Sequence, residues 1–169
     1  MQAFDVLSIM SQLAIAITGF SGVVSVFGPR GGATFDNPDY VRLVSLLTAS
    51  LSAFVLCVIA ILLLLASIDE KAVWRIVSLL VAFERAVWLS QFVRNRKVFL
   101  RAGQTLAFFY IFSVGGALVI ILASTNAFLL GMFWPFTYCI VWYLIESSFV
   151  FVRLTLRRVA PDVNGQGDR

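Results

Sequence analysis

Long apolar runs are the feature of this sequence that most restricts its fold. Four of them, at about 6–27, 40–66, 103–124 and 127–152, are separated by short polar breaks. Each has the roughly 20 mostly apolar residues that an α-helix needs to cross a bilayer. A helix is the element expected there, because lipid offers no hydrogen-bond partner to backbone N–H and C=O groups. The sequence therefore predicts an all-α integral membrane protein.

The segment 72–93 is also long enough to cross, but it carries Arg75, Glu84 and Arg85. An interfacial helix would gather its charges on one face, whereas Arg75 and Glu84 lie on opposite sides at about 100° per residue. A charge in mid-membrane costs about 2.5–3.5 kcal/mol on insertion scales, and a neighbouring partner lowers that cost. The alternative is four spans with one interfacial or re-entrant helix at 68–95. We favour a compact bundle of five membrane helices, at about 6–27, 40–66, 72–93, 103–124 and 127–156.

Local signals mark where some of these helices begin. Asn37 can cap the second span, and Pro38 fits its first turn, where the missing N–H costs nothing. Ser67 and Glu70 have the spacing of a capping box, which predicts the start of the third helix. Pro135 lies inside the last run and predicts a kink there.

Composition agrees with a membrane protein and narrows the functional classes. Of the 169 residues, 60% are hydrophobic and 13% are charged, against about half and a quarter in soluble domains. The charges lie beside the apolar runs, so the net charge of +4 does not indicate a nucleic-acid partner. We expect a single transmembrane helical domain, 1–160, followed by a disordered cytoplasmic tail, 161–169, which is polar and begins with a proline.

The residues that support common catalytic and metal sites are scarce. Histidine is absent, which excludes a Ser-His-Asp triad, bis-His haem and His-ligated zinc. Cys57 and Cys139 each lie deep in an apolar run and are expected to be buried free thiols. We therefore expect no enzyme activity, no metal and no cofactor.

The first span carries small and hydroxyl residues along one face. In lipid such a face needs a protein or water neighbour, so it predicts either a helix-packing seam or the weakly polar wall of a pore in a ring of subunits. Ser45, Thr48 and Ser52 partly mirror it on the second span, which makes a seam between these two helices the default. The residues of this pore or packing face are Ser11, Thr18, Gly19, Ser21, Gly22 and Ser25.

Three ionisable residues lie within the predicted spans: Glu84, Arg85 and Glu146. Arg85 is nine residues before Arg94 and Glu146 is seven before Arg153, or about 13 and 10 Å at 1.5 Å per residue. The two lie at nearly the same depth, so we predict that Arg85 and Glu146 pair across helices. The pair could set only the helix order. The alternatives are a charged constriction, proton site or gate, and a protonated Glu146.

Two further features concern packing and lipid contact. The adjacent Gly115 and Gly116 predict a close helix crossing rather than a hinge. Basic residues follow the third span and end the last one, and we expect them to bind anionic lipid headgroups on the cytoplasmic side. They are Arg94, Arg96, Lys97, Arg101, Arg157 and Arg158. This basic bias places the C-terminus in the cytoplasm with either four or five spans, and the N-terminus outside with five.

Some short motifs carry a resemblance. The glycine-bearing first span, "VWR" at 73–75 and "FVRL" at 151–154 together resemble a loose group of small uncharacterised bacterial multi-span inner-membrane proteins with an "IAGFSG"-type first span. Here that motif is Ile15-Ala16-Ile17-Thr18-Gly19-Phe20-Ser21-Gly22, with Ile-Thr inserted. The resemblance implies a bacterial inner-membrane location and five hydrophobic helices, and it brings no activity.

Two functions fit a small membrane bundle without catalytic residues. The first is a homo-oligomeric channel or pore for ions or small solutes, whose subunits associate through the Gly/Ser face of the first span. The second is a non-catalytic accessory or structural subunit of a larger membrane complex. A proton-coupled transporter using Glu146 is weaker, because no inverted repeat is visible, and a lipid-modifying enzyme ranks last.

Overall fold

The computed structural model describes residues 3–26, 37–94 and 106–159, which form helices and short turns without a strand. Five of the helices are long and apolar enough to cross a membrane. The predicted all-α bundle of five membrane helices is therefore confirmed. Its elements are α1 (Ala3–Val26), α2 (Asn37–Leu65), α3 (Glu70–Arg94), α5 (Leu106–Thr125), the π-helical turn η1 (Asn126–Leu130) and α6 (Phe133–Val159).

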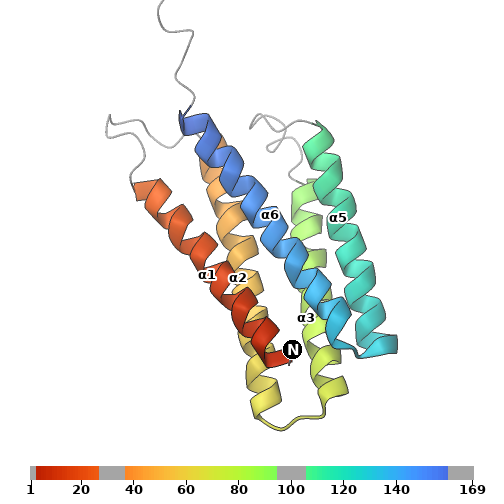
Figure 1. Ribbon diagram of the computed structural model, residues 1–169. Coiled ribbons are helices and arrows are strands. Elements are labelled where there is room, and N and C mark those ends of the chain that lie inside the picture. The colour runs from red at the N-terminus through yellow and green to blue at the C-terminus, as the bar shows by residue number, and fades with distance from the viewer. Residues whose placement is uncertain (1–2, 27–36, 95–105, 160–169) are drawn as a thin grey trace, which may run out of the picture.

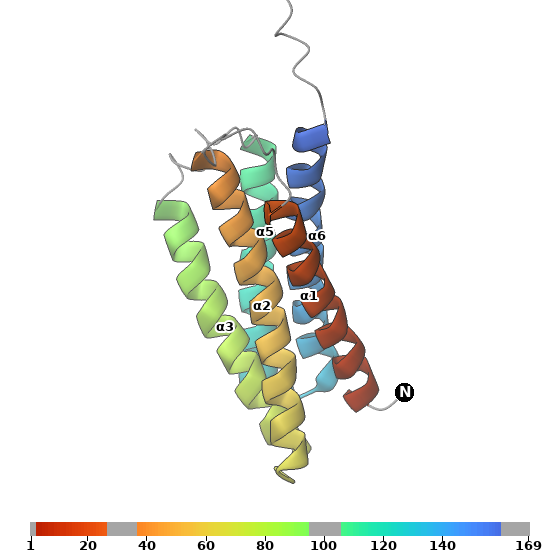
Figure 2. The ribbon, with the colours of Figure 1, turned by 90° about the vertical axis from the view of Figure 1, so that its left-hand side faces the viewer.

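The helices run side by side along one long axis (Figure 1). Turned by 90°, α3, α2 and α1 stand next to one another, with α5 and α6 behind them (Figure 2). α2 packs mainly on α1 and α6, α3 packs mainly on α5, and α6 touches α1, α2, α3 and α5. The start of α1 and the end of α6 lie at opposite ends of the bundle (Figure 1), as an odd number of crossings requires.

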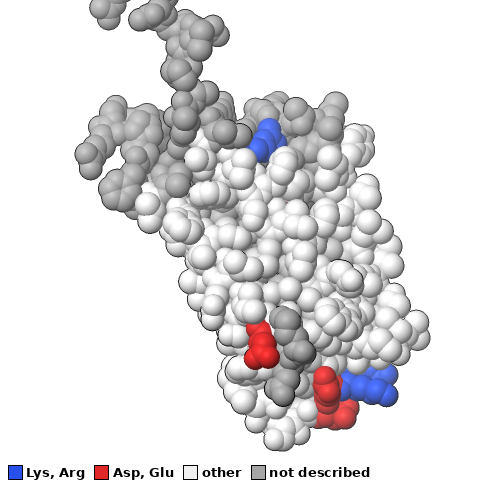
Figure 3. Space-filling model, viewed as in Figure 1, with Lys and Arg blue, Asp and Glu red and all other residues white. Residues whose placement is uncertain are grey.

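The surface of the bundle suits a bilayer. On the face seen in Figure 3, charged side chains of described residues lie near the two ends, and the band between them carries none. Large apolar side chains such as Phe20, Phe83 and Leu118 are at least 60% exposed, which lipid accommodates without cost. The interior packs around Trp74, Phe136 and other apolar residues, and both cysteines are buried and free as expected.

The alternative of an interfacial third helix is wrong, because α3 runs the length of the bundle beside α2 and α5 (Figures 1 and 2). Its buried residues Val73, Val77, Val81 and Arg85 recur every four positions on one face. The costly Arg85 therefore points into the protein rather than into lipid. Arg75, near the start of the helix, is exposed.

α3 begins at Glu70, but its capping residue is not the predicted Ser67. Asp69 Oδ2 accepts a hydrogen bond from the Ala72 backbone N–H at 3.3 Å, which is the N-cap interaction. Ser67 instead has a φ of 57° in the turn that follows α2, and Glu70 accepts a hydrogen bond from the Trp74 indole. α2 begins at Asn37, as its sequence signals predict.

The last helix begins at Phe133 rather than at 127, and Pro135 lies in its first turn. The preceding helix continues through η1 and ends at Gly131, whose φ of 63° suits a residue without a side chain. The amide of Asn126 joins the two helices: its Nδ2 donates to Met132 O and its Oδ1 accepts from Met132 N, both at 2.9 Å. Pro135 therefore fits a helix start and does not act as a mid-helix kink.

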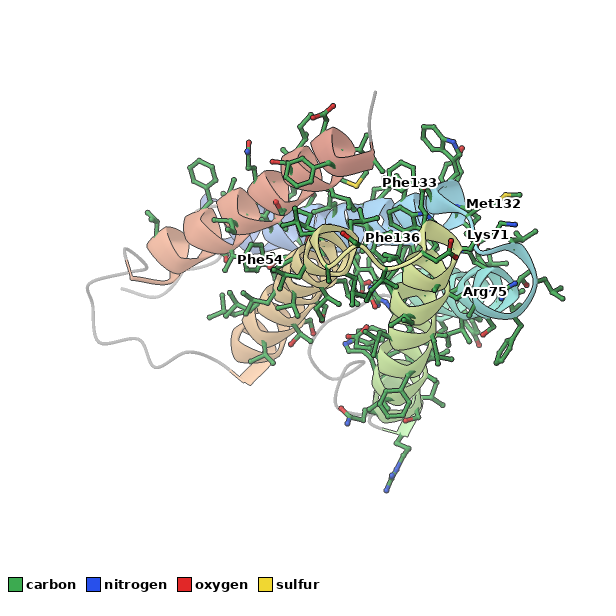
Figure 4. All side chains as sticks on the ribbon, turned by 90° about the horizontal axis from the view of Figure 1, so that it is seen from below. Phe54, Lys71, Arg75, Met132, Phe133 and Phe136 are labelled. Atoms are coloured by element: carbon green, nitrogen blue, oxygen red, sulfur yellow. The ribbon has the colours of Figure 1, made fainter. Side chains whose placement is uncertain are left out.

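The same turn is anchored to α3. Asn126 Nδ2 lies 2.7 Å from Ser78 Oγ and donates to it. At Gly131 an added Cβ would approach the Arg75 side chain and the Lys71 carbonyl to 3.2 and 3.3 Å. Viewed from below, Lys71, Arg75 and Met132 gather at this end, where the first turns of α3 meet the α5–α6 turn (Figure 4).

Candidate functional site

The predicted ion pair between Arg85 and Glu146 is confirmed. Arg85 Nη2 on α3 lies 2.6 Å from Glu146 Oε2 on α6, and the two residues are only 2% and 4% exposed. Neither atom has a hydrogen bond of good angle, so the short distance identifies the contact as an ion pair held by charge. The number of residues between each side chain and the basic residue that flanks its helix was enough to predict this pair.

Two aromatic rings hold the guanidinium in place. Arg85 Cζ lies 3.7 Å from the centroid of the Tyr143 ring and 5.3 Å from that of Trp88. Tyr143 comes three residues before Glu146, so both side chains project from the same face of α6. A cation over an aromatic face gains electrostatic stabilisation that grows as water is excluded.

Glu84 connects the pair to a third helix. Its Oε1 accepts a hydrogen bond of 3.1 Å from Ser52 on α2, and its Oε2 accepts one from the Tyr143 hydroxyl on α6. We call Glu84, Arg85, Tyr143 and Glu146 the charge cluster. It contains two carboxylates and one guanidinium, so it carries one negative charge in excess when both acids are ionised.

Sequence reasoning missed the role of Tyr143 in this cluster. A phenol inside an apolar run needs a hydrogen-bond partner, and its spacing of three from Glu146 was the signal available. Ser52 was noted only as part of a hydroxyl face toward the first span. In the structure its hydroxyl donates a hydrogen bond to Glu84 on α3 instead.

Glu84 also faces a groove of about 700 Å³ between α2 and α3. One wall is the face of α2 from Thr48 to Ile59, and the other is the face of α3 from Leu80 to Gln91. Most of the lining is apolar, and Glu84 is its acidic member. The charge cluster therefore has one buried side, at Arg85 and Glu146, and one side that opens toward the surface of the bundle.

The structure divides the small-residue face of α1 into two parts. Ser21 is fully buried, and Thr18 donates a hydrogen bond of 2.8 Å to Ser50 on α2. Gly19 and Gly22 are exposed on the outside, and a Cβ at either would meet open space. Thr18 thus forms part of a seam with α2, as the packing interpretation predicts, and Ser21 is buried in the bundle, while the glycines face outward.

The other predicted residues of this face are less informative. Ser11 is half-buried and donates to the Ser8 carbonyl within its own helix at 2.8 Å. Ser25 lies in the last turn of α1, with its side chain outside the described residues.

The predicted headgroup contacts are only partly within the described residues. Arg94 ends α3 and is exposed. Arg157 and Arg158 lie in the last turns of α6, with side chains outside the described part of the chain. Arg96, Lys97, Arg101 and the tail 161–169 fall outside it altogether.

The described ranges hold no group of three His, Cys, Asp or Glu side chains that could bind a metal ion. The chain matches no protein-family model, no curated protein and no solved structure. The charge cluster and the groove therefore have to be interpreted from their own chemistry.

Proposed function

We propose that the protein forms a homo-oligomeric channel for ions or small solutes in a bacterial inner membrane, with a preference for cations. The observation that carries the proposal is the excess carboxylate in the charge cluster. Ionisable residues inside a membrane are costly, and they mark ion or proton paths more often than lipid-facing surface. Acidic side chains along such a path favour cations.

Several copies are needed because the interior of one chain is filled. Trp74, Phe136 and Tyr143 are at most 2% exposed and occupy the space between the helices. The groove at Glu84 opens on the outside of the bundle. A path past Glu84 would therefore run between subunits, in a closed ring of copies.

The outer face of α1 supplies a surface for such association. Small residues let helix backbones approach closely, and Gly19 and Gly22 are exposed there. Thr18 and Ser21 are turned toward the protein interior, so we place the path at Glu84 and not along the hydroxyls of α1.

We propose that the C-terminus lies in the cytoplasm and that the basic residues after α3 and at the end of α6 contact anionic headgroups. The bias of Lys and Arg toward that end of the bundle supports this orientation. The inner-membrane location rests on the resemblance of the first span.

Flux through purified protein in liposomes tests the channel. We expect cation flux that falls several-fold in Glu84→Gln, because the variant removes the charge and leaves the shape nearly unchanged. Glu70→Gln is the matched control, since Glu70 is an exposed acid on the same helix, near its start. An intact oligomer that passes no ion would contradict the proposal.

The exposed glycine face equally favours a second function, that of an accessory subunit bound to a different membrane protein. Mild extraction from native membranes distinguishes the two. A channel is recovered as a ring of identical chains, whereas an accessory subunit is recovered with a foreign subunit and shows no flux alone.

A further inference from the structure

We infer that the groove between α2 and α3 binds an amphiphilic organic cation, whose charged centre contacts the Glu84 carboxylate while its apolar groups fill the groove. The inference concerns binding and does not require that any ion crosses the membrane. It therefore goes beyond the proposed channel and can be tested apart from it.

The size of the groove selects an organic ligand. Its volume of about 700 Å³ lies within the range of roughly 300–1,000 Å³ for sites that bind small organic molecules. Leu51, Val55 and Val87 contribute to walls that are mostly apolar, with few polar side chains among them. An organic cation carries apolar groups that match these walls, which a small inorganic cation lacks.

The charge of the groove selects a cation. Glu84 is held by hydrogen bonds from Ser52 and Tyr143, but the neighbouring Arg85 has Glu146 as its ion-pair partner. An ionised carboxylate has about four acceptor sites, so two remain beyond those two hydrogen bonds. A negative charge in an apolar surrounding is unfavourable without a counter-charge, and a bound cation would supply one.

An exposed aromatic ring reinforces this preference. Phe83 and Trp88 line the groove on either side of Glu84 in the α3 sequence. The face of the exposed Phe83 ring can attract an organic ammonium or phosphonium group, whereas Trp88 already lies beside the Arg85 guanidinium and stacks on Phe92. A carboxylate in a groove with an exposed aromatic ring is therefore complementary to a cation whose charge is spread over a bulky apolar group.

Depth excludes a phospholipid headgroup as the source of that cation. Glu84 is ten residues before Arg94, at the end of α3, or about 15 Å at 1.5 Å per residue. This places the carboxylate near the middle of a hydrocarbon core of about 30 Å. A headgroup amine lies at the interface, so we assign the site to a free amphiphilic cation.

Binding of tetraphenylphosphonium to the full-length protein in detergent tests the assignment, with empty micelles subtracted. Tetraphenylborate is the matched control, because it has the same shape and the opposite charge. We expect saturable binding of the phosphonium and none of the borate. Glu84→Gln should weaken phosphonium binding by about tenfold or more, which corresponds to a loss of about 1.4 kcal/mol or more of charge attraction in a partly buried site. Glu70→Gln should leave binding unchanged.

A second pair of variants tests the location without altering charge. Val55→Trp places a bulky side chain in the groove and should weaken binding by obstructing the ligand. The control is Leu62→Trp. Leu62 lies seven residues further along α2, is 58% exposed and does not line the groove. This variant should bind the phosphonium as the native protein does. Elution at the same volume as the native protein shows that each variant is folded.

Four results would overturn the inference: equal binding of phosphonium and borate, native affinity in folded Glu84→Gln, native affinity in folded Val55→Trp, or no saturable binding of phosphonium. The first would identify the groove as a site for acyl chains, selected by apolarity alone. Glu84-dependent binding without flux would support this site and contradict the channel. Flux without phosphonium binding would support the channel and contradict this site.

Discussion

At the scale of single residues, the feature that most affects stability is the buried guanidinium of Arg85, which contacts both a carboxylate and an aromatic ring. Arg85 faces Glu146 at 2.6 Å and lies over the Tyr143 ring. Two charges removed from water are tolerated because each offsets the other, and neither would be tolerated alone. Removing one member of the pair should therefore lower the stability of the folded protein.

Arg85→Met should destabilise the protein by about 3–5 kcal/mol, because it leaves Glu146 buried without a counter-charge. The double variant Arg85→Met with Glu146→Met should recover much of this loss. Denaturant or thermal midpoints in detergent measure both effects, and Arg94→Met, at an exposed position on the same helix, is the control. A double variant as unstable as the sum of the single ones would show that the pair is not a unit.

At the scale of elements, two contacts set how α5 and α6 meet. The first is a close crossing, as the adjacent glycines predict. A Cβ at Gly115 would overlap the Trp142 ring, whereas a Cβ at Gly116 would lie 3.7 Å from Leu89. Of the two, only Gly115 lacks room for a side chain, because Trp142 occupies the space beside it. The sequence gives no sign of this difference.

Gly115→Ala should destabilise the bundle by about 1–3 kcal/mol, because a rigid ring must move to admit the methyl group. Gly116→Ala should be neutral or stabilising by up to roughly 1 kcal/mol, since alanine is the better helix former. Melting curves of the two purified variants, measured side by side, give the comparison. Equal losses in both would mean that Trp142 does not occupy the space beside Gly115.

The second contact is the Asn126 amide, which links η1, the start of α6 and α3 through three hydrogen bonds. Asn126 is fully buried, so Asn126→Ala should cost about 2–3 kcal/mol by leaving Met132 N and its other partners unsatisfied. Thr125→Val is the control, because the Thr125 hydroxyl only donates to Ile121 O within its own helix. Limited proteolysis at the α5–α6 turn should increase in the alanine variant and not in the valine variant.

At the scale of the whole molecule, five crossings place the two ends of the chain on opposite sides of the membrane. Reporter fusions should find the C-terminus in the cytoplasm and the N-terminus outside, because most Lys and Arg flank the spans at the C-terminal end of the bundle. Both ends on one side would mean that one of the five helices does not cross in the membrane.

The fold follows from sequence to a large extent because lipid imposes simple rules. A run of about 20 apolar residues must become a helix, and the third span was predicted despite its three charges. The Arg85–Glu146 pair followed from depth alone. Which residue caps α3 did not follow, since the capping-box spacing favoured Ser67, whereas the turn geometry brings Asp69 to the cap. The start of α6 was misjudged because 127–130 is apolar enough to belong to either helix.

The sequence by itself determined the solvent of this protein, four of its spans and the residues that could not be left in lipid, while the course of α3 through the bundle decided in favour of the fifth. The tertiary structure decided which of them meet: Thr18 with Ser50, Glu84 with Tyr143 and Ser52, and an open groove where α2 and α3 do not close on each other. The physical reason is that burial in lipid depends on the composition of each segment. Contact between helices depends on their rotation and tilt, which are set jointly by all five.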